Sequence, residues 1–339
     1  MPPLGADVLP NEKFSCGTLA LASSLHHQVA DLRGFLDFLE LWAQLTRGEL
    51  VDFSKIPNDW THTPSRFFSG LHGRSSVSVA PPGFRVLPRP ALGPPAFLLV
   101  PSEVTRWKLT KSSVEKLKND FSPVTTVSKE SWISSGDAIA ALLCAVVTRA
   151  RENAKVARLD GRSSVESQVE TFMMAADGRE RSPGGNMLDG QYFGNFNPLF
   201  ETVVQRSDLL SLSNEAGSRV ALAIRNALST QLSPEAIADK CAFMEDPRNS
   251  QPPRIAWTAD VIGTNWCRFD LQGPKLNFGW GKFFLATQGG GTVFPPGYFV
   301  LTQDKTSGDV LALLTIEKAA AAELKVDAVL NKYASLIPV

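Results

Sequence analysis

Cysteine is scarce in this chain of 339 residues, and the four that occur are scattered. They are Cys16, Cys144, Cys241 and Cys267. Because a disulfide framework or a zinc site needs cysteines at paired spacing, we expect neither. A reducing intracellular compartment is the simpler interpretation.

Net charge and long apolar runs are also missing. Basic and acidic side chains balance at 34 each, which argues against a nucleic-acid or anionic-membrane partner. The longest apolar run, 139–147, is far too short to span a bilayer, and residues 1–14 carry no pattern typical of a signal peptide. With 43% apolar and 20% charged residues, the chain is typical of a soluble, cytoplasmic globular protein of one large or two ordinary domains.

Histidine is equally rare, with four residues in the chain. Two are adjacent, His26 and His27, and the others are His62 and His72. Together with Asp31 they match no recognised metal-ligand spacing, so we expect no bound metal.

Hydrophobic periodicity predicts a mixture of strands and helices. Residues 14–24 alternate as a strand, and apolar residues from Leu32 to Leu45 follow helical spacing up to a stop at Gly48. The other predicted strands are 100–109, 169–176, 255–264, 297–303 and 309–316, and the other predicted helices are 112–119, 136–151, 207–229, 234–244 and 319–333. Because strands and helices do not alternate strictly, we expect an α/β fold with mixed sheets.

A proline-rich stretch at 74–96 is the clearest break in the chain. Proline removes a backbone donor and fixes φ, so this composition predicts an extended linker. It separates a first domain, 1–73, from a second, 97–339.

Two motifs, far apart in sequence, carry the chemistry. The first is His26-His27-Gln28-Val29-Ala30-Asp31, and the second is Asn277-Phe278-Gly279-Trp280-Gly281. Further matches follow in a fixed order: Ser135-Gly136-Asp137-Ala138, Asp177-Gly178-Arg179 and Tyr192-Phe193-Gly194-Asn195. Over roughly residues 12–335 the chain therefore resembles the BAHD acyltransferases, and most closely their fungal, trichothecene-acetyltransferase-like members.

The resemblance implies a two-domain fold of the chloramphenicol-acetyltransferase type with a channel between the domains. It also implies acyl-CoA as co-substrate, and a small secondary metabolite as the acceptor, through a hydroxyl or an amine. No permanently bound cofactor is implied, and we expect a monomer. Neither motif identifies the residues that contact CoA or the donors for an oxyanion.

His27 is the candidate general base. Its unperturbed pKa leaves an imidazole mostly neutral near pH 7, so it can take the acceptor's proton as the oxygen attacks the thioester. The resemblance gives His26 a supporting role, and it turns Asp31 away from the channel to pair with an arginine. We therefore expect Asp31 to hold the turn in shape rather than to orient His27 as in a triad. The family has glycine after this aspartate, where this chain has Leu32.

The second motif is expected to be a structural turn. Gly279 and Gly281 permit a tight bend, and Phe278 and Trp280 can pack beside it. The family's first residue is Asp, which serves an ion pair, and here it is Asn277. We expect an arginine such as Arg179 or Arg181 to be its partner, held less firmly because the charge is lost.

The first motif arrives early in the chain, whereas a sizeable segment precedes it in the family. We therefore expect the first domain to be incomplete. Two alternatives to the acyltransferase stay open. One is a truncated, non-catalytic paralogue that binds a ligand or partner. The other is a condensation-type domain of a peptide synthetase, which shares the His-His-x-x-x-Asp run.

Overall fold

The computed structural model describes residues 12–13, 15–17, 19–56, 79–86, 100–123, 131–156, 168–181, 192–246, 248–249, 255–256, 259–281 and 294–338. Two predictions lie largely or wholly outside these residues: the 74–96 linker, of which only 79–86 are described, and the histidines His62 and His72. Within the described part, no helix combines the length and apolar character that crossing a membrane requires.

The chain divides into two compact units that do not follow a single cut along the sequence. Unit 1 comprises Met1–His72, Asp177–Asn197 and Asp270–Thr292. Unit 2 comprises Gly73–Ala176, Pro198–Phe269 and Val293–Val339. Segments 177–197 and 270–292 lie within the range predicted for the second domain, but their contacts place both in unit 1. Both motifs therefore belong to unit 1.

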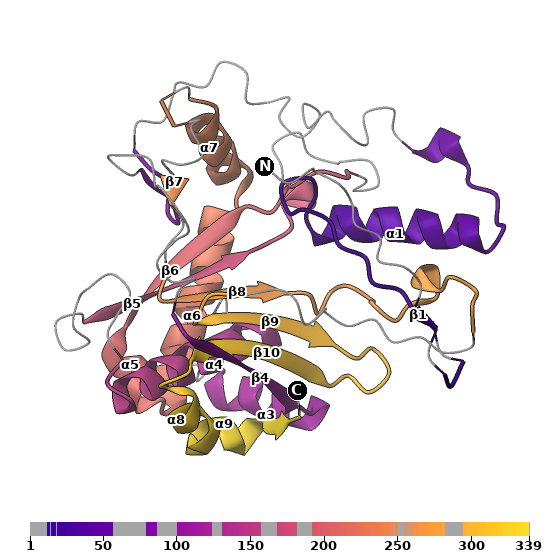
Figure 1. The fold of residues 1–339 in the computed structure, drawn as a ribbon. Helices are drawn as coiled ribbons and strands as arrows, with labels where there is room; N and C mark the ends of the chain where they lie inside the picture. Colours follow the sequence, from indigo (N-terminus) through magenta and orange to yellow (C-terminus); the bar gives the residue numbers. More distant parts are fainter. Residues whose placement is uncertain are drawn as a thin grey trace. The chain divides into compact units, whose positions relative to one another are not determined.

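A seven-stranded sheet is the centre of unit 2 (Figure 1). In spatial order its strands are β11 (Ser335–Ile337), β4 (Ser102–Leu109), β10 (Val310–Glu317), β9 (Tyr298–Gln303), β8 (Val261–Asn265), β5 (Val169–Ala175) and β6 (Leu199–Gln205). β8 runs parallel to both β5 and β9, and the other neighbouring strands are antiparallel. The predicted α/β fold with a mixed sheet is confirmed.

Helix α4 (Ser135–Asn153) forms the core of unit 2 together with this sheet. Every residue from Ala138 to Thr148 is buried, as expected for a helix that is packed on all sides. Ser134 and Asp137 close a capping box at its first turn. The remaining elements of unit 2 are α3 (Lys111–Phe121), α5 (Arg206–Ser211), α6 (Asn214–Gln231), α7 (Pro234–Glu245), α8 (Ala321–Val326), α9 (Ala328–Tyr333) and the strand pair β3 (Arg85–Val86) and β7 (Ile255–Ala256).

Helix α1 (Leu32–Thr46) is the main element of unit 1. It buries Leu36 and Ala43 on one face, and the chain leaves it at Gly48, whose φ of +73° favours glycine. This matches the helix and the stop predicted from the sequence. The other described elements of unit 1 are β1 (Glu12–Lys13), β2 (Leu19–Ala20) and the single 3₁₀ turns η1 (Phe53–Lys55), η3 (Arg179–Arg181) and η6 (Pro274–Leu276).

The predicted strand 14–24 is wrong in extent. Only β2 lies within it, paired antiparallel with β1. A turn at 15–17 interrupts the alternation, and Gly17 takes a φ of +85° there. The sequence pattern of small and apolar residues does not reveal this reversal.

Two predicted helices are each divided. Within 207–229 the left-handed φ of +43° at Leu212 ends α5, and Ser213 then caps α6. Within 319–333 the Asp327 carboxylate accepts two amides at the start of α9, which separates it from α8.

Candidate functional site

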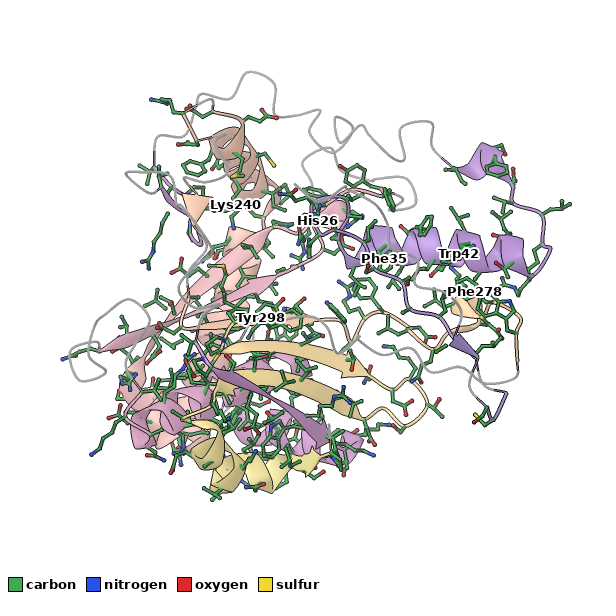
Figure 2. The ribbon with its side chains drawn as sticks, in the orientation of Figure 1. His26, Phe35, Trp42, Lys240, Phe278 and Tyr298 are labelled. Carbon is green, nitrogen blue, oxygen red and sulfur yellow. The ribbon has the colours of Figure 1, made fainter. Side chains whose placement is uncertain are left out.

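A tight turn carries the two adjacent histidines in front of α1. The carbonyl of His26 accepts the amide of Val29 at 2.8 Å, and the His26 Nδ1 accepts the amide of Gln28 at 3.2 Å. Both histidines are exposed, and Figure 2 labels His26 near the start of α1. One ring nitrogen of His26 is thus occupied, whereas no described residue bonds to the ring of His27. Of the pair, His27 is the one whose two ring nitrogens have no partner among the described residues.

Asp31 is fully engaged by structural partners. It is the N-cap of α1, where its Oδ1 accepts the Gly34 amide at 3.0 Å. The same oxygen accepts Arg179 at 2.9 Å, and the Oδ2 accepts Arg179 at 3.0 Å and the Phe196 amide at 2.7 Å. None of these four donors is the ring of His27. The geometry favours a carboxylate that holds the turn and does not orient the base.

Arg179 is the arginine that holds Asp31, and its side chain is 2% exposed. Beyond Asp31, it donates to the Asp177 carboxylate at 3.0 Å and to the carbonyls of Tyr192 and Gly194 at 2.8 and 3.0 Å. Burial alone would lower the pKa of Arg179, but the two carboxylates raise it above its ordinary value. A buried charge needs such partners, and here they come from two separate segments of unit 1, 1–72 and 177–197.

The backbone of Phe193 lies directly against α1 at Gly34. A Cβ placed on Gly34 would overlap the Phe193 carbonyl oxygen and would lie 2.6 Å from its carbonyl carbon. Glycine is required at this position because no side chain fits there. Leu32, where the family has glycine, begins α1 and is only partly buried, so the helix accommodates it.

Asn195 is the described side chain that reaches the His27 backbone. Its Nδ2 donates to the His27 carbonyl at 2.8 Å. This contact was not predicted from the sequence, although the Tyr192-Phe193-Gly194-Asn195 run was the available signal. A run of residues that matches the family indicates that the segment has a role, but only the tertiary structure shows which atom it contacts.

The second motif forms a glycine turn, as the sequence predicted. The Asn277 Oδ1 accepts the amide of Gly279 at 2.8 Å, and Gly279 has a φ of +81°. An L side chain is strained at such a φ, which explains glycine at this position. Gly281, at the other end of the bend, would have no described atom within 4 Å of an added Cβ.

Aromatic rings join this turn to α1, as the labelled side chains in Figure 2 show. The Phe278 ring packs edge-on against Trp42 at 5.2 Å and lies 5.1 Å from Trp280, which is 44% exposed. Trp42 is three helical turns beyond Asp31, roughly 15 Å along the helix axis. The turn therefore braces the far end of α1, away from the histidines, which favours a structural role.

The predicted pairing of Asn277 with an arginine such as Arg179 is wrong. Arg179 is occupied by Asp31, and it is Arg47, just past α1, that donates to the Asn277 backbone carbonyl. Arg47 also makes a bidentate pair with Glu49, at 2.6 and 2.9 Å. Because Glu49 already supplies a carboxylate, the loss of the family's aspartate leaves no unpaired arginine at this turn.

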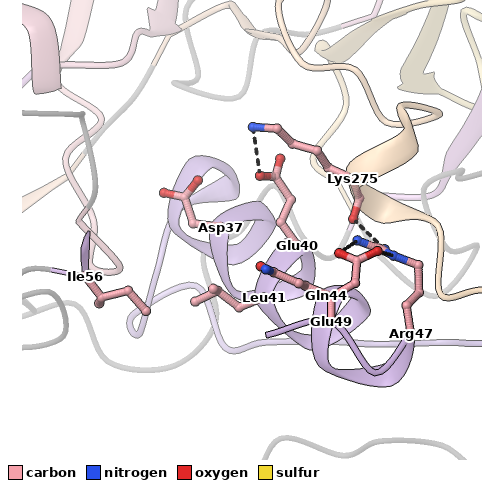
Figure 3. Close-up of a pocket in the computed structure, with 8 residues that line it drawn as sticks. All are labelled: Asp37, Glu40, Leu41, Gln44, Arg47, Glu49, Ile56 and Lys275. Atoms are coloured by element: carbon pink, nitrogen blue, oxygen red, sulfur yellow. Dashed lines mark hydrogen bonds and ion pairs between the residues drawn. The ribbon is translucent and has the colours of Figure 1, made fainter. Parts of the chain in front are cut away.

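A cavity of about 310 Å³ lies along a polar face of α1 (Figure 3). It is lined by Asp37, Glu40, Leu41, Gln44, Arg47, Glu49, Ile56 and Lys275. Glu40 pairs with Lys275 at 3.5 Å, and Asp37 pairs with Arg33 at 3.1 Å. Burial raises the pKa of Asp37 to about 6. Its Oδ2 is buried and has no hydrogen-bond partner in the described part of the chain.

The described residues contain no group of three or more His, Cys, Asp or Glu side chains placed to hold a metal ion. The three buried or half-buried cysteines have a pKa raised by desolvation, well above the ordinary value for Cys144 and to about 12 and 11 for Cys241 and Cys267. A thiol with a raised pKa is a poor nucleophile, so they serve packing.

Comparison with known proteins agrees with this geometry. The model of the Transferase family matches residues 10–329. A curated relative, "Acyltransferase uat1" of Mycosarcoma maydis, is 28% identical over 232 residues. That alignment covers 60% of this chain and 42% of the relative, so the chain spans less than half of that protein's length.

Solved structures share the fold. F. sporotrichioides TRI101, complexed with coenzyme A and T-2, matches with a TM-score of 0.72 at 19% identity, covering 95% of this chain and 69% of that one. Vinorine synthase matches with a TM-score of 0.59 at 19% identity, covering 93% and 63%. At this identity the likeness establishes the architecture and leaves the chemistry to the residues.

Proposed function

The chain belongs to the Transferase family, the BAHD-type acyltransferases, and on that premise we propose that it transfers an acyl group from acyl-CoA to a small molecule. The acceptor group is a hydroxyl or an amine of a secondary metabolite. His27 is the general base. Acyl-CoA is a co-substrate that leaves as free CoA.

One observation carries the proposal: the contrast between His27 and Asp31 within one turn. The ring of His27 is exposed and unbonded in the described structure, while every bond of the Asp31 carboxylate serves the turn itself. A base needs an accessible nitrogen on a rigid support. The turn supplies both, because its far end is locked by a buried ion pair.

The reaction requires one proton to move twice. His27 takes the proton of the acceptor hydroxyl as its oxygen attacks the thioester carbonyl, and a new carbon–oxygen bond forms. The tetrahedral intermediate then collapses, the carbon–sulfur bond breaks, and His27 returns the proton to the CoA thiolate. The thioester is already activated, so a base contribution of about 10²–10⁴ in rate is sufficient help.

Support for CoA as the donor comes from the relatives. Structures of TRI101 hold coenzyme A together with T-2 or deoxynivalenol, and another holds ethyl coenzyme A. These ligands are those of the relatives, and they supply the first probes for this chain.

The test measures thiol release from acetyl-CoA in the presence of a panel of alcohols and amines that includes T-2. We expect acceptor-dependent release by the wild-type protein. His27→Ala should lower it by about 10²–10⁴-fold with an unchanged unfolding midpoint, because the side chain is exposed and bonds to nothing described. His26→Ala is the matched control, since it removes the neighbouring imidazole and should cost far less.

Two results would contradict the proposal. One is acceptor-dependent turnover retained by a folded His27→Ala. The other is a folded wild-type protein whose thermal unfolding is unmoved by acetyl-CoA or CoA at high concentration, because a ligand at 100 times its Kd adds about 2.7 kcal/mol.

A further inference from the structure

We propose that Asn195 is a positioning residue for His27, fixing the backbone of the base through its side-chain amide. The inference rests on the proposed function, because it gives His27 the role of base. It adds a residue to the site from outside both sequence motifs.

The hydrogen bond reaches the base at its own backbone. The Asn195 Nδ2 donates to the His27 carbonyl at 2.8 Å, across 168 positions of sequence. The turn around His27 is otherwise open, since residues 26–29 are all exposed. Its internal bonds, from Val29 and Gln28 to His26, close the turn on itself and do not tie it to the rest of unit 1.

Adjacent residues of the same segment anchor the end of the turn. The Phe196 amide donates to Asp31 at 2.7 Å, and the Gly194 carbonyl accepts Arg179 at 3.0 Å. Asn195 stands between these two anchors, so its Cα is fixed by the ion-pair network. The Cα of Asn195 is held in place, and its side-chain amide is hydrogen-bonded to the His27 carbonyl. This one hydrogen bond therefore restrains the position of the base.

This arrangement leaves one polar atom of Asn195 without a hydrogen bond to any described residue. Its Oδ1 is buried and has no hydrogen-bond partner among the described residues. Rotating the amide by 180° would bring the Oδ1 against the His27 carbonyl, so the bond to His27 determines the orientation and leaves the oxygen unpaired. Buried acceptors without a hydrogen-bond partner are rare in folded proteins. The unpaired Oδ1 is therefore consistent with a side chain that is kept for the contact that its Nδ2 makes.

Loss of this restraint on the base should be measurable as a loss of reaction rate. A base must sit within hydrogen-bond reach of the acceptor's proton, and a displacement of about 1 Å costs about 10²-fold in rate. Asn195→Asp keeps the size of the side chain but removes the donor. Asn197→Ala is the matched control, because Asn197 lies two residues on, in the same segment, and has no hydrogen bond in the described structure.

The first readout follows the contact directly. His27-Gln28 is the one His-Gln step in the sequence, so labelling histidine with ¹³C at the carbonyl and glutamine with ¹⁵N gives a single HNCO peak. We expect the ¹³C shift of this carbonyl to move in Asn195→Ala and Asn195→Asp and to stay in place in Asn197→Ala. An unmoved peak in both Asn195 variants would overturn the proposal.

The second readout follows the base. With acetyl-CoA and the acceptor that shows His27-dependent turnover, we expect kcat to fall by about 10–100-fold in Asn195→Ala and Asn195→Asp, with KM for acetyl-CoA within about twofold. The unfolding midpoint should stay close to that of Asn197→Ala. Unchanged kcat in folded variants, or a loss of kcat matched by a loss of folded protein, would overturn the positioning role.

The two readouts separate this proposal from the one on which it rests. If the wild-type protein shows no His27-dependent turnover with any probe, the proposed function fails and the positioning role fails with it, whatever the peak does. If turnover is present but insensitive to Asn195, only the positioning role fails.

Discussion

The Asp31 carboxylate and the Arg179 guanidinium meet in a two-point ion pair, with nitrogen–oxygen distances of 2.9 and 3.0 Å. Their side chains are 8% and 2% exposed. The pair joins the turn behind the histidines to a segment 148 positions away. It therefore holds the shape of the turn that carries both histidines.

Breaking this pair should destabilise the protein strongly. Arg179→Ala leaves the Asp31 charge buried without its main partner, which costs about 3–5 kcal/mol of unfolding free energy. Chemical denaturation measures the change. Arg219→Ala is the control, because Arg219 pairs with Asp208 at the surface with 60% of its side chain exposed. Equal effects of the two substitutions would contradict the account.

Asp37 should make the protein less stable as the pH rises. Its pKa is raised by burial from 3.8 to about 6, so the folded state binds more protons than the unfolded state between those values. The free energy of unfolding then falls as pH rises through about 4 to 6, by about 3 kcal/mol in total for a shift of about two pH units.

Asp37→Asn isolates this effect, because the titrations of all other groups cancel in the difference in unfolding free energy between variant and wild type. We expect the variant to gain stability relative to wild type across this window and to keep the gain at pH 8. Glu40→Gln, on the same helix but beside the largely exposed Lys275, should show no such gain. A variant less stable than wild type at pH 8 would contradict the prediction.

Gly34→Ala should disrupt the site by overlap. The added Cβ meets the backbone of Phe193, which cannot rotate away as a side chain can. We expect a loss at or above the upper end of the usual 1–3 kcal/mol for overpacking, roughly 3 kcal/mol, in chemical denaturation. Gly281→Ala is the control for stability, since its Cβ meets no atom of the described residues within 4 Å. A tolerated Gly34→Ala would show that the 192–196 segment does not pack against α1 as described.

Restoring the family's aspartate in the second motif should change little. Asn277→Asp adds a charge to the residue whose backbone carbonyl accepts Arg47, and that guanidinium is already paired with Glu49. We expect an unfolding midpoint close to that of wild type. In the background Glu49→Gln, where Arg47 lacks its carboxylate, the same Asn277→Asp change should raise the midpoint. A gain of equal size in both backgrounds would mean that Glu49 does not take the aspartate's place.

Local chemistry was readable from the sequence because it depends on neighbours along the chain. The periodicity from Leu32 onward and the Gly48 stop predicted α1, and the motifs identified the family and the candidate base. Strands and helices do not alternate strictly along the chain, and this order predicted a mixed sheet. Each of these follows from backbone preference or side-chain spacing within a few residues.

The partners of the charged groups were decided by the tertiary structure alone. Arg179 was assigned to the wrong motif, because sequence order cannot tell which distant carboxylate shares a buried site with a given arginine. The amide of Asn195 and the raised pKa of Asp37 were invisible for the same reason: they depend on burial and on contacts across the chain. The sequence by itself identified His27 as the candidate base, and the fold determined which residues contact the turn that carries it.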